Sequence, residues 1–230
     1  MWMKHDNVRR MIDDRCSNKN KPYLLGPLLS AASIHANTSG VFKGFYKNSK
    51  TGKGQFGGDA QNCLSRITKE IILPAPIFSD FECDVCVFKK DTNVLIKELD
   101  KIDVAYFDPP YNQHPYGSNY FMLNIICDYK KPVQISKISG IPTDWNRSDY
   151  NKKDDALKAF NDLINNTNAE IILISYSNEG ILSVDELSKI SKKYGKLKIK
   201  EKQYNAFRGS RNLKNRDKDV EEILFIIKKG

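Results

Sequence analysis

A short apolar strand that runs directly into two prolines constrains this chain more than any other feature. Residues 104–107 read Val-Ala-Tyr-Phe, and Asp108, Pro109, Pro110 and Tyr111 follow at once. Proline fixes φ and has no amide donor, so the turn is stiff and rich in hydrogen-bond acceptors. In open α/β sheets, ligands bind beyond the carboxyl ends of the strands. The pattern therefore predicts a site at the end of a buried strand, with Asp108 at its mouth.

The chain from residue 81 onward alternates between strand and helix patterns, which predicts an open, doubly wound α/β sheet. The expected strands are 81–89, 104–107, 170–176, 196–204 and 221–229, the last two as an antiparallel pair. The expected helices are 92–99, 118–129, 154–167 and 183–194. Ser183 and Glu186 have the spacing of a capping box at the start of the last helix. Residues 1–80 instead suggest helices followed by a glycine- and lysine-rich loop at 37–62.

Several segments, in order, resemble the Dam-like, DPPY-type adenine-N6 DNA methyltransferases. Besides residues 108–111, the similar segments are 36–42, 116–124, 147–148, 175–180 and 207–212, so the resemblance extends from about residue 22 to the C-terminus. It implies a Rossmann-like class I methyltransferase fold, S-adenosyl-L-methionine as methyl donor and double-stranded DNA as substrate. The region 81–230 would be catalytic, and 1–80 a helical and loop segment with a target-recognition part. The motif alone does not separate DNA from RNA.

The chemistry of an exocyclic amine explains the residues of the motif. The lone pair of adenine N6 is delocalised into the ring, so the nitrogen is a poor nucleophile. A carboxylate from Asp108 and the carbonyl of Pro109 can accept its two N–H groups and stabilise the positive charge of the transition state. Pro110 keeps the loop rigid. Tyr111 offers a face on which a base extruded from the duplex can stack.

The cofactor half of the resemblance is incomplete. The resemblance assigns cofactor contacts to Asp91 and Asp108, although Asp91 equally suits the N-terminus of a helix. The family's Phe-x-Gly-x-Gly loop after its first strand is missing, because residues 1–21 contain no glycine. Its strand lies beside the catalytic strand, so residues 104–107 would keep an unpaired apolar edge. We therefore expect a truncated or split enzyme that needs a complementary N-terminal chain, or an inactive remnant or DNA-binding subunit.

The charge distribution favours a polyanionic partner. The net charge is +9, and eight basic residues against one acid lie between Lys196 and Arg216. Arg208, Arg211 and Lys214 are predicted to hold DNA phosphates, and so are Lys43 and Lys47 of the loop. A lysine-rich edge strand and a solvated loop are equal alternatives. Whether a cognate restriction endonuclease accompanies the chain stays open.

Other function classes find little support in the sequence. The N-terminus lacks the apolar core of a signal peptide, and no apolar run has the roughly 20 residues of a membrane helix. Five scattered cysteines do not form a disulfide framework, which fits the cytoplasm. Cys83-x-x-Cys86 lacks the second pair of a zinc site, so we expect two half-buried strand cysteines and no metal.

Overall fold

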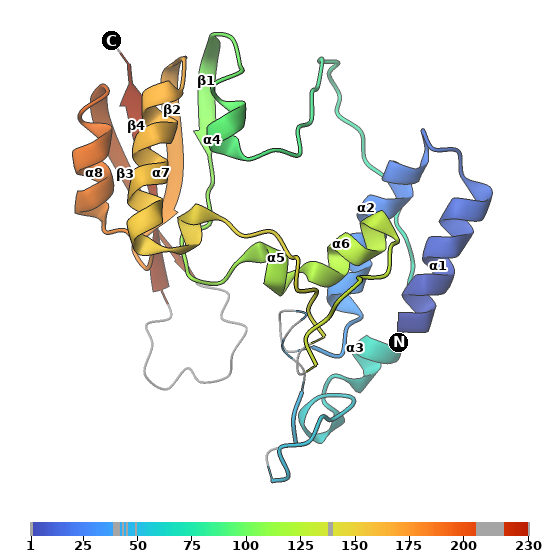
Figure 1. Cartoon of the computed structure of the whole chain (residues 1–230). Helices are drawn as coiled ribbons and strands as arrows, with labels where there is room; N and C mark the ends of the chain where they lie inside the picture. The colour runs from blue at the N-terminus through green and yellow to red at the C-terminus, as the bar shows by residue number, and fades with distance from the viewer. Residues whose placement is uncertain are drawn as a thin grey trace. The chain divides into compact units, whose positions relative to one another are not determined.

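The computed structural model describes residues 2–38, 42, 44, 46–48, 50–137, 140–205 and 219–229. The chain forms two compact units (Figure 1), one of residues 1–84 with 116–145 and one of residues 85–115 with 146–230. The predicted division into a helical and loop segment 1–80 and a catalytic region 81–230 stays a prediction. No helix in the described ranges is long and apolar enough to cross a membrane.

The first unit is helical. Its helices are α1 (Trp2–Arg15), α2 (Lys21–Ile34), α3 (Leu64–Thr68), α5 (Tyr116–Asn119) and α6 (Phe121–Asp128). Ile12, Leu28, Ala32 and Ile126 form its small buried core. The predicted helix 118–129 is in fact two helices, since Tyr120 has a non-helical backbone, with φ −118° and ψ 21°.

The second unit contains a four-stranded sheet with the order β1-β2-β4-β3. Its strands are β1 (Ile102–Phe107), β2 (Ala169–Ser177), β3 (Lys196–Asn205) and β4 (Asp219–Lys228). β1 and β2 are parallel, and β4 is antiparallel to both β2 and β3. The predicted antiparallel pair of β3 and β4 is confirmed. β4 lies between β2 and β3 and is antiparallel to both, so the sheet is mixed.

Helices cover one face of this sheet. α4 (Thr92–Leu95), α7 (Lys153–Asn166) and α8 (Val184–Ser191) accompany the strands (Figure 1). Phe160 and Leu163 of α7 and Leu187 of α8 are buried in one core with Ile172, Ile174 and Phe225 of the sheet. The helix predicted at residues 154–167 is confirmed as α7, and so is the capping box of α8, where Ser183 Oγ accepts from the amide of Glu186.

The opposite face of the sheet is open in the described part of the chain. Val104 is 50% exposed and Tyr106 is 59% exposed on β1. Helices thus cover one face rather than the two expected of a doubly wound sheet. The architecture is a mixed α/β arrangement with a four-stranded sheet, consistent with the Rossmann-like fold that the sequence predicted, and the incompleteness of the sheet stays a prediction.

The prediction of a strand at residues 81–89 is wrong. These residues form no regular structure, and all of their side chains are exposed. Phe81, Val85 and Val87 keep the alternation of a strand, but a strand needs a hydrogen-bonded neighbour, and none lies beside this segment among the described residues. Cys83 and Cys86 are accordingly exposed free thiols rather than half-buried strand residues.

Candidate active site

The predicted catalytic loop begins where β1 ends. Phe107, the last residue of β1, pairs with the fully buried Ile174 of β2, which anchors the strand end. Asp108 is exposed, and Pro109 and Pro110 are half-buried. Neither the carboxylate of Asp108 nor the carbonyl of Pro109 has a hydrogen-bond partner among the described residues. Two adjacent acceptors are therefore left available to an outside donor.

Tyr111 is held in place by Tyr176 of β2 and by the segment that follows β2. Its carbonyl accepts a hydrogen bond from the amide of Ile181 at 2.8 Å. Its ring forms a T-shaped pair with Tyr176, with 6.1 Å between the centroids and 72° between the planes. Tyr176 is fully buried, and its hydroxyl accepts from the amide of Leu182 at 3.1 Å. Burial raises the pKa of Tyr176, so its phenol stays neutral under the loop.

The next residue of the loop is fixed from another direction. The side-chain Nδ2 of Asn151 donates to the carbonyl of Asn112 at 2.7 Å. Asn151 ends the short helix Asp149–Asn151, which begins where Ser148 Oγ accepts from the amide of Tyr150 at 3.3 Å. The Oδ1 atom of Asn112 accepts from the amide of His114 at 2.9 Å, which closes a local turn. The loop is thus tied down immediately after its two prolines.

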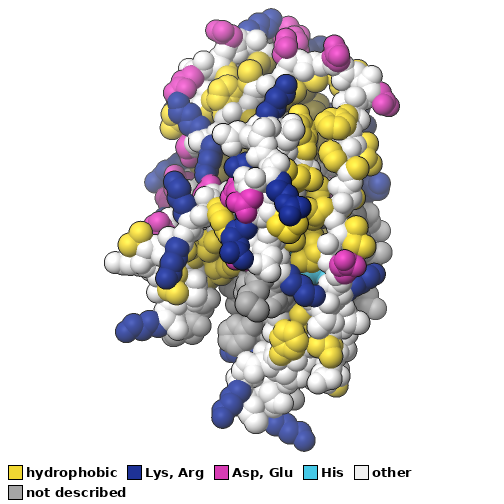
Figure 2. Space-filling model, turned by 90° about the vertical axis from the view of Figure 1, so that its right-hand side faces the viewer, with side chains coloured by type: hydrophobic (Ala, Val, Ile, Leu, Met, Phe, Trp, Pro, Cys, Tyr) yellow, Lys and Arg dark blue, Asp and Glu magenta, His cyan; other side chains and the backbone are white. Residues whose placement is uncertain are grey.

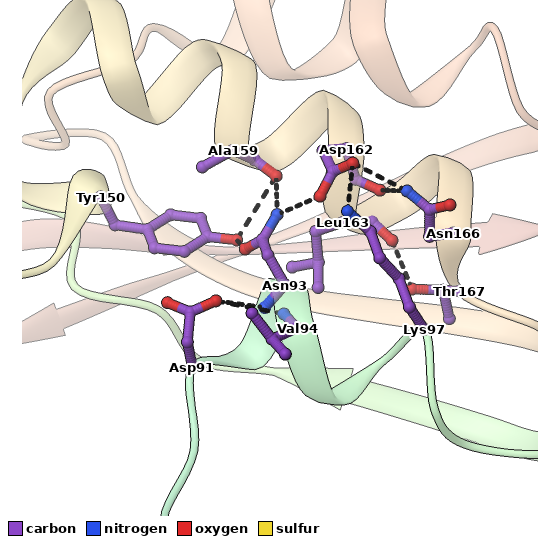
Figure 3. Close-up of polar contacts among 10 residues, drawn as sticks. All are labelled: Asp91, Asn93, Val94, Lys97, Tyr150, Ala159, Asp162, Leu163, Asn166 and Thr167. Atoms are coloured by element: carbon purple, nitrogen blue, oxygen red, sulfur yellow. Dashed lines mark hydrogen bonds and ion pairs between the residues drawn. The ribbon is translucent and has the colours of Figure 1, made fainter.

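Asp91, the predicted cofactor residue, caps α4 in this structure. Its carboxylate accepts from the amides of Asn93 and Val94 at 3.0 and 3.1 Å (Figure 3). These are the contacts of an N-cap, the structural alternative that the sequence left open. The Asp91 side chain is also exposed, so contact with a cofactor stays a prediction.

Asn93 connects α4 to α7 and to Tyr150. Its Nδ2 donates to the carbonyl of Ala159 at 2.8 Å and to Asp162 at 2.9 Å, and its Oδ1 accepts from the Tyr150 hydroxyl at 2.7 Å (Figure 3). Burial raises the pKa of Tyr150. The hydrogen bond from Asn93 and the neighbouring Lys97 hold the pKa of Asp162 below its usual range. This network fixes α4 against α7, next to the helix Asp149–Asn151 that carries the loop anchor.

The described residues do not form a cofactor cradle of the kind that the resemblance implies. Gly57 and Gly58 have φ values of 90° and 83°, and they lead into the short helix Asp59–Gln61 rather than follow a strand. A Cβ at Gly58 would lie 2.9 Å from Sγ of Cys63, so this glycine serves a local turn. The described residues around Asp108 therefore include no glycine loop that follows a strand.

Of the residues predicted to contact DNA, only Lys47 lies among the described residues. Arg208, Arg211, Lys214 and Lys43 lie outside the described residues. Lys47 is exposed, and its backbone forms a bridge with Gly54 in the first unit. A pocket in the same unit contains none of the predicted site residues; its lining is His5, Asp6, Arg9, Met122, Ile125, Ile126 and Tyr129.

The sequence did not single out three residues that shape the loop and its surroundings. Asn151 and Asn93 carry no recognisable pattern, because a polar residue near a helix end is ordinary. Gly180 lay inside a segment noted for its resemblance, but its role was not foreseen. A Cβ at residue 180 would overlap the ring of Tyr176, so only glycine lets that ring reach its position.

Comparisons with known proteins identify the family of the chain. The model of the D12 class N6 adenine-specific DNA methyltransferase family matches residues 31–190, which is more than half of the chain. The chain is 31% identical over 209 residues to type II methyltransferase M.NlaIII of Neisseria lactamica, covering 90% of this chain and 58% of that protein. It is 30% identical over 224 residues to M.CviAII of Paramecium bursaria Chlorella virus 1, covering 96% of this chain and 61% of that protein.

A third relative, modification methylase StsI of Streptococcus sanguinis, is 32% identical over 214 residues, which cover 90% of this chain and 30% of that protein. The chain thus spans little more than half of the first two relatives and less than a third of the third. No solved structure matches the chain. Because the family model matches residues 31–190, which include β1, the loop after it and α7, the chain belongs to the D12 class of N6 adenine-specific DNA methyltransferases.

Proposed function

We propose that this chain supplies the target-base half of an enzyme that methylates adenine N6 at specific sites in double-stranded DNA. S-adenosylmethionine, the methyl donor that the family implies, would provide the methyl group. The observation that carries the proposal is that the carboxylate of Asp108 and the carbonyl of Pro109, after the end of β1, have no hydrogen-bond partner in the part of the chain that the structure describes. Two acceptors on a rigid loop match the two N–H groups of one amine.

Each residue of the loop has a proposed role. Asp108 and Pro109 accept the amine protons, which favours a tetrahedral nitrogen with its lone pair released from the ring. Tyr111 offers its ring to the extruded base, while the Tyr176 contact and the Ile181 amide keep that ring in place. Arg208, Arg211, Lys214, Lys43 and Lys47 are proposed to hold the phosphates of the duplex.

We further propose that a complementary strand-bearing segment completes the sheet beside β1. The two edges of the sheet differ in a way that supports this. β3, one edge, exposes Lys196, Lys198, Lys200 and Lys202, which blunt an edge against pairing. β1, the other edge, exposes Val104 and Tyr106 instead.

The occupant that fits this edge is an α/β segment, with a strand to pair with β1 and a helix to cover the open face. Hydrophobic side chains are visible at the surface in several places (Figure 2), and Phe81, Val85 and Val87 of the unpaired segment 81–89 are among the exposed ones of the chain. The proposed α/β segment would also carry the glycine loop for the cofactor.

We also propose that a cognate restriction endonuclease accompanies the chain, because two of the relatives are named type II methyltransferases.

Incorporation of tritiated methyl groups into DNA that lacks N6-methyladenine tests both proposals. One arm contains the purified chain alone, and the other adds the part of M.NlaIII outside the matched stretch, produced as a separate polypeptide. Incorporation only in the second arm supports both proposals. Incorporation by the chain alone supports the activity and rejects the need for a complement. Asp108→Ala should abolish the signal in either arm, and incorporation in neither arm contradicts the activity.

A further inference from the structure

The two carbonyls that follow the prolines are held by donors from two different elements. The amide of Ile181, after β2, binds the carbonyl of Tyr111. The side chain of Asn151, before α7, binds the carbonyl of Asn112 at 2.7 Å. A loop fixed at only one of these points could still rotate about that point. Two ties on adjacent residues therefore set both the position and the direction of the loop.

Asn151 is unusual among the groups that hold the loop, because it is a buried polar side chain with an unsatisfied atom. It is 9% exposed, and its Oδ1 has no hydrogen-bond partner in the part of the chain that the structure describes. A buried acceptor without a donor costs stability. An apolar residue of similar size would avoid that cost, so packing alone does not explain an asparagine here. The hydrogen bond from its Nδ2 to the loop is what asparagine provides.

The placement of Asn151 is itself well supported. The Ser148 cap begins the short helix, and the Tyr150 ring lies against Phe160 of α7 with 4.9 Å between the centroids. The Tyr150 hydroxyl donates to Asn93 of α4. The residue next to Asn151 is thus fixed to two helices of the core, so the amide that reaches Asn112 rests on a rigid base.

We propose that Asn151 is a positioning residue for the catalytic loop, acting through the carbonyl of Asn112 to hold Tyr111 and the acceptors of Asp108 and Pro109 in register with the target base. Nothing in the loop motif itself assigns this role. The proposal rests on the proposed function for its consequence in catalysis. Its structural part, the tie between Asn151 and the loop, is testable without any activity.

Hydrogen exchange of the full chain provides the structural test. Asn151→Asp keeps the size of the side chain but replaces the donor by an acceptor. We expect the amides of His114 and Ile181, which donate to Asn112 Oδ1 and to the Tyr111 carbonyl, to exchange about tenfold faster in this variant at pH 7, with β2 and α7 unaltered. Asn165→Asp, at an exposed position of α7, is the matched control. Unaltered exchange of the His114 and Ile181 amides in Asn151→Asp would overturn the proposal.

Asn151→Leu guards against misfolding of the charged variant, since it removes the unsatisfied atom together with the donor. It should keep the melting temperature within a few degrees of wild type and still speed the exchange of the His114 and Ile181 amides. If this variant also keeps those amides protected, Asn151 does not hold the loop.

The catalytic part is tested in whichever arm of the tritium assay methylates DNA. There kcat should fall about tenfold in Asn151→Asp with little change in KM, because the tie orients the reacting groups. The deficit should shrink as the pH falls, because a protonated carboxyl can again donate to Asn112. Faster exchange with an unchanged kcat would overturn the positioning role. Faster exchange in a protein that methylates no DNA would support the hydrogen bond between Asn151 and the loop but contradict the proposed function.

Discussion

Gly180 and the ring of Tyr176 are in such close contact that any Cβ at residue 180 would overlap the ring atoms Cε1 and Cζ. Because Tyr176 is fully buried and also forms the T-shaped pair with Tyr111, the ring has nowhere to move. The glycine thereby links the segment after β2 to the catalytic loop.

Gly180→Ala should therefore destabilise the chain by about 1–3 kcal/mol, the usual cost of overpacking a core. Thermal unfolding measures this as a lower melting temperature. Gly26→Ala is the matched control, because a Cβ at Gly26 meets nothing within 4 Å and alanine favours the α2 helix. An unchanged melting temperature for Gly180→Ala would show that the ring of Tyr176 is not confined.

Replacement of Asp91 separates its two interpretations. Serine is a good N-cap and alanine is not, so Asp91→Ala should cost about 1 kcal/mol of stability while Asp91→Ser costs little. Chemical denaturation measures both. If Asp91 also contacts the cofactor, calorimetry on the methylating form should show weaker S-adenosylmethionine binding for both variants. If S-adenosylmethionine binding weakens only in Asp91→Ala, the less stable variant, Asp91 acts as a helix cap and does not contact the cofactor.

The sequence predicted the parts of the fold that depend on local patterns. The apolar stripe of α7, the capping box of Ser183 and Glu186, and the strand that ends at Asp108 depend on neighbours a few residues away, and all three are confirmed. Residues 81–89 carry an equally clear alternation, yet they form no strand. Alternation shows that a segment can pair, but a neighbouring strand must be present for pairing to occur.

The loop anchors could not be predicted for a related reason. Asn151 lies 39 positions from Asn112 along the chain, and an asparagine can bond to any nearby carbonyl. Only the folded arrangement of β1, β2 and the short helix Asp149–Asn151 brings the two together. Motifs identify residues whose chemistry is distinctive, whereas positioning residues are defined by where the fold places them.

The pH dependence of stability should report on the Asn93 network. Hydrogen bonding from Asn93 and the ion pair with Lys97 at 3.0 Å lower the pKa of Asp162 below its ordinary value of 3.8. A lowered folded-state pKa stabilises the fold above the unfolded pKa, and this contribution is lost as the pH falls through the folded pKa. The side chain is 38% exposed, so solvent screening limits the effect to about 1 kcal/mol or less.

Asp162→Asn should accordingly be less stable than wild type at pH 7, and the difference should decrease below about pH 4. Urea denaturation at several pH values measures the difference in free energy of unfolding. A deficit that is the same at pH 3 and pH 7 would show that the carboxylate charge does not contribute.

Hydrogen exchange should also distinguish the two edges of the sheet from its interior. The amides of β1 that point away from β2 should exchange at nearly open-chain rates, whereas those of β2, which has a strand on each side, should be protected. Addition of the complementary part of M.NlaIII should slow the exposed amides of β1 only. Protection of all β1 amides in the chain alone would mean that the edge is already paired.

The exposed lysines of β3 and the exposed Val104 and Tyr106 of β1 make the two edges of the described sheet unequal. If the proposed segment pairs with β1, strands add at that edge of the sheet and are disfavoured at the lysine-rich edge of β3. Production of the chain in excess of whatever completes β1 would favour pairing between identical copies and loss to aggregates. The amounts of the two parts would therefore have to be matched, and a lysine placed at Val104 should raise the recovery of the chain by itself while blocking its assembly.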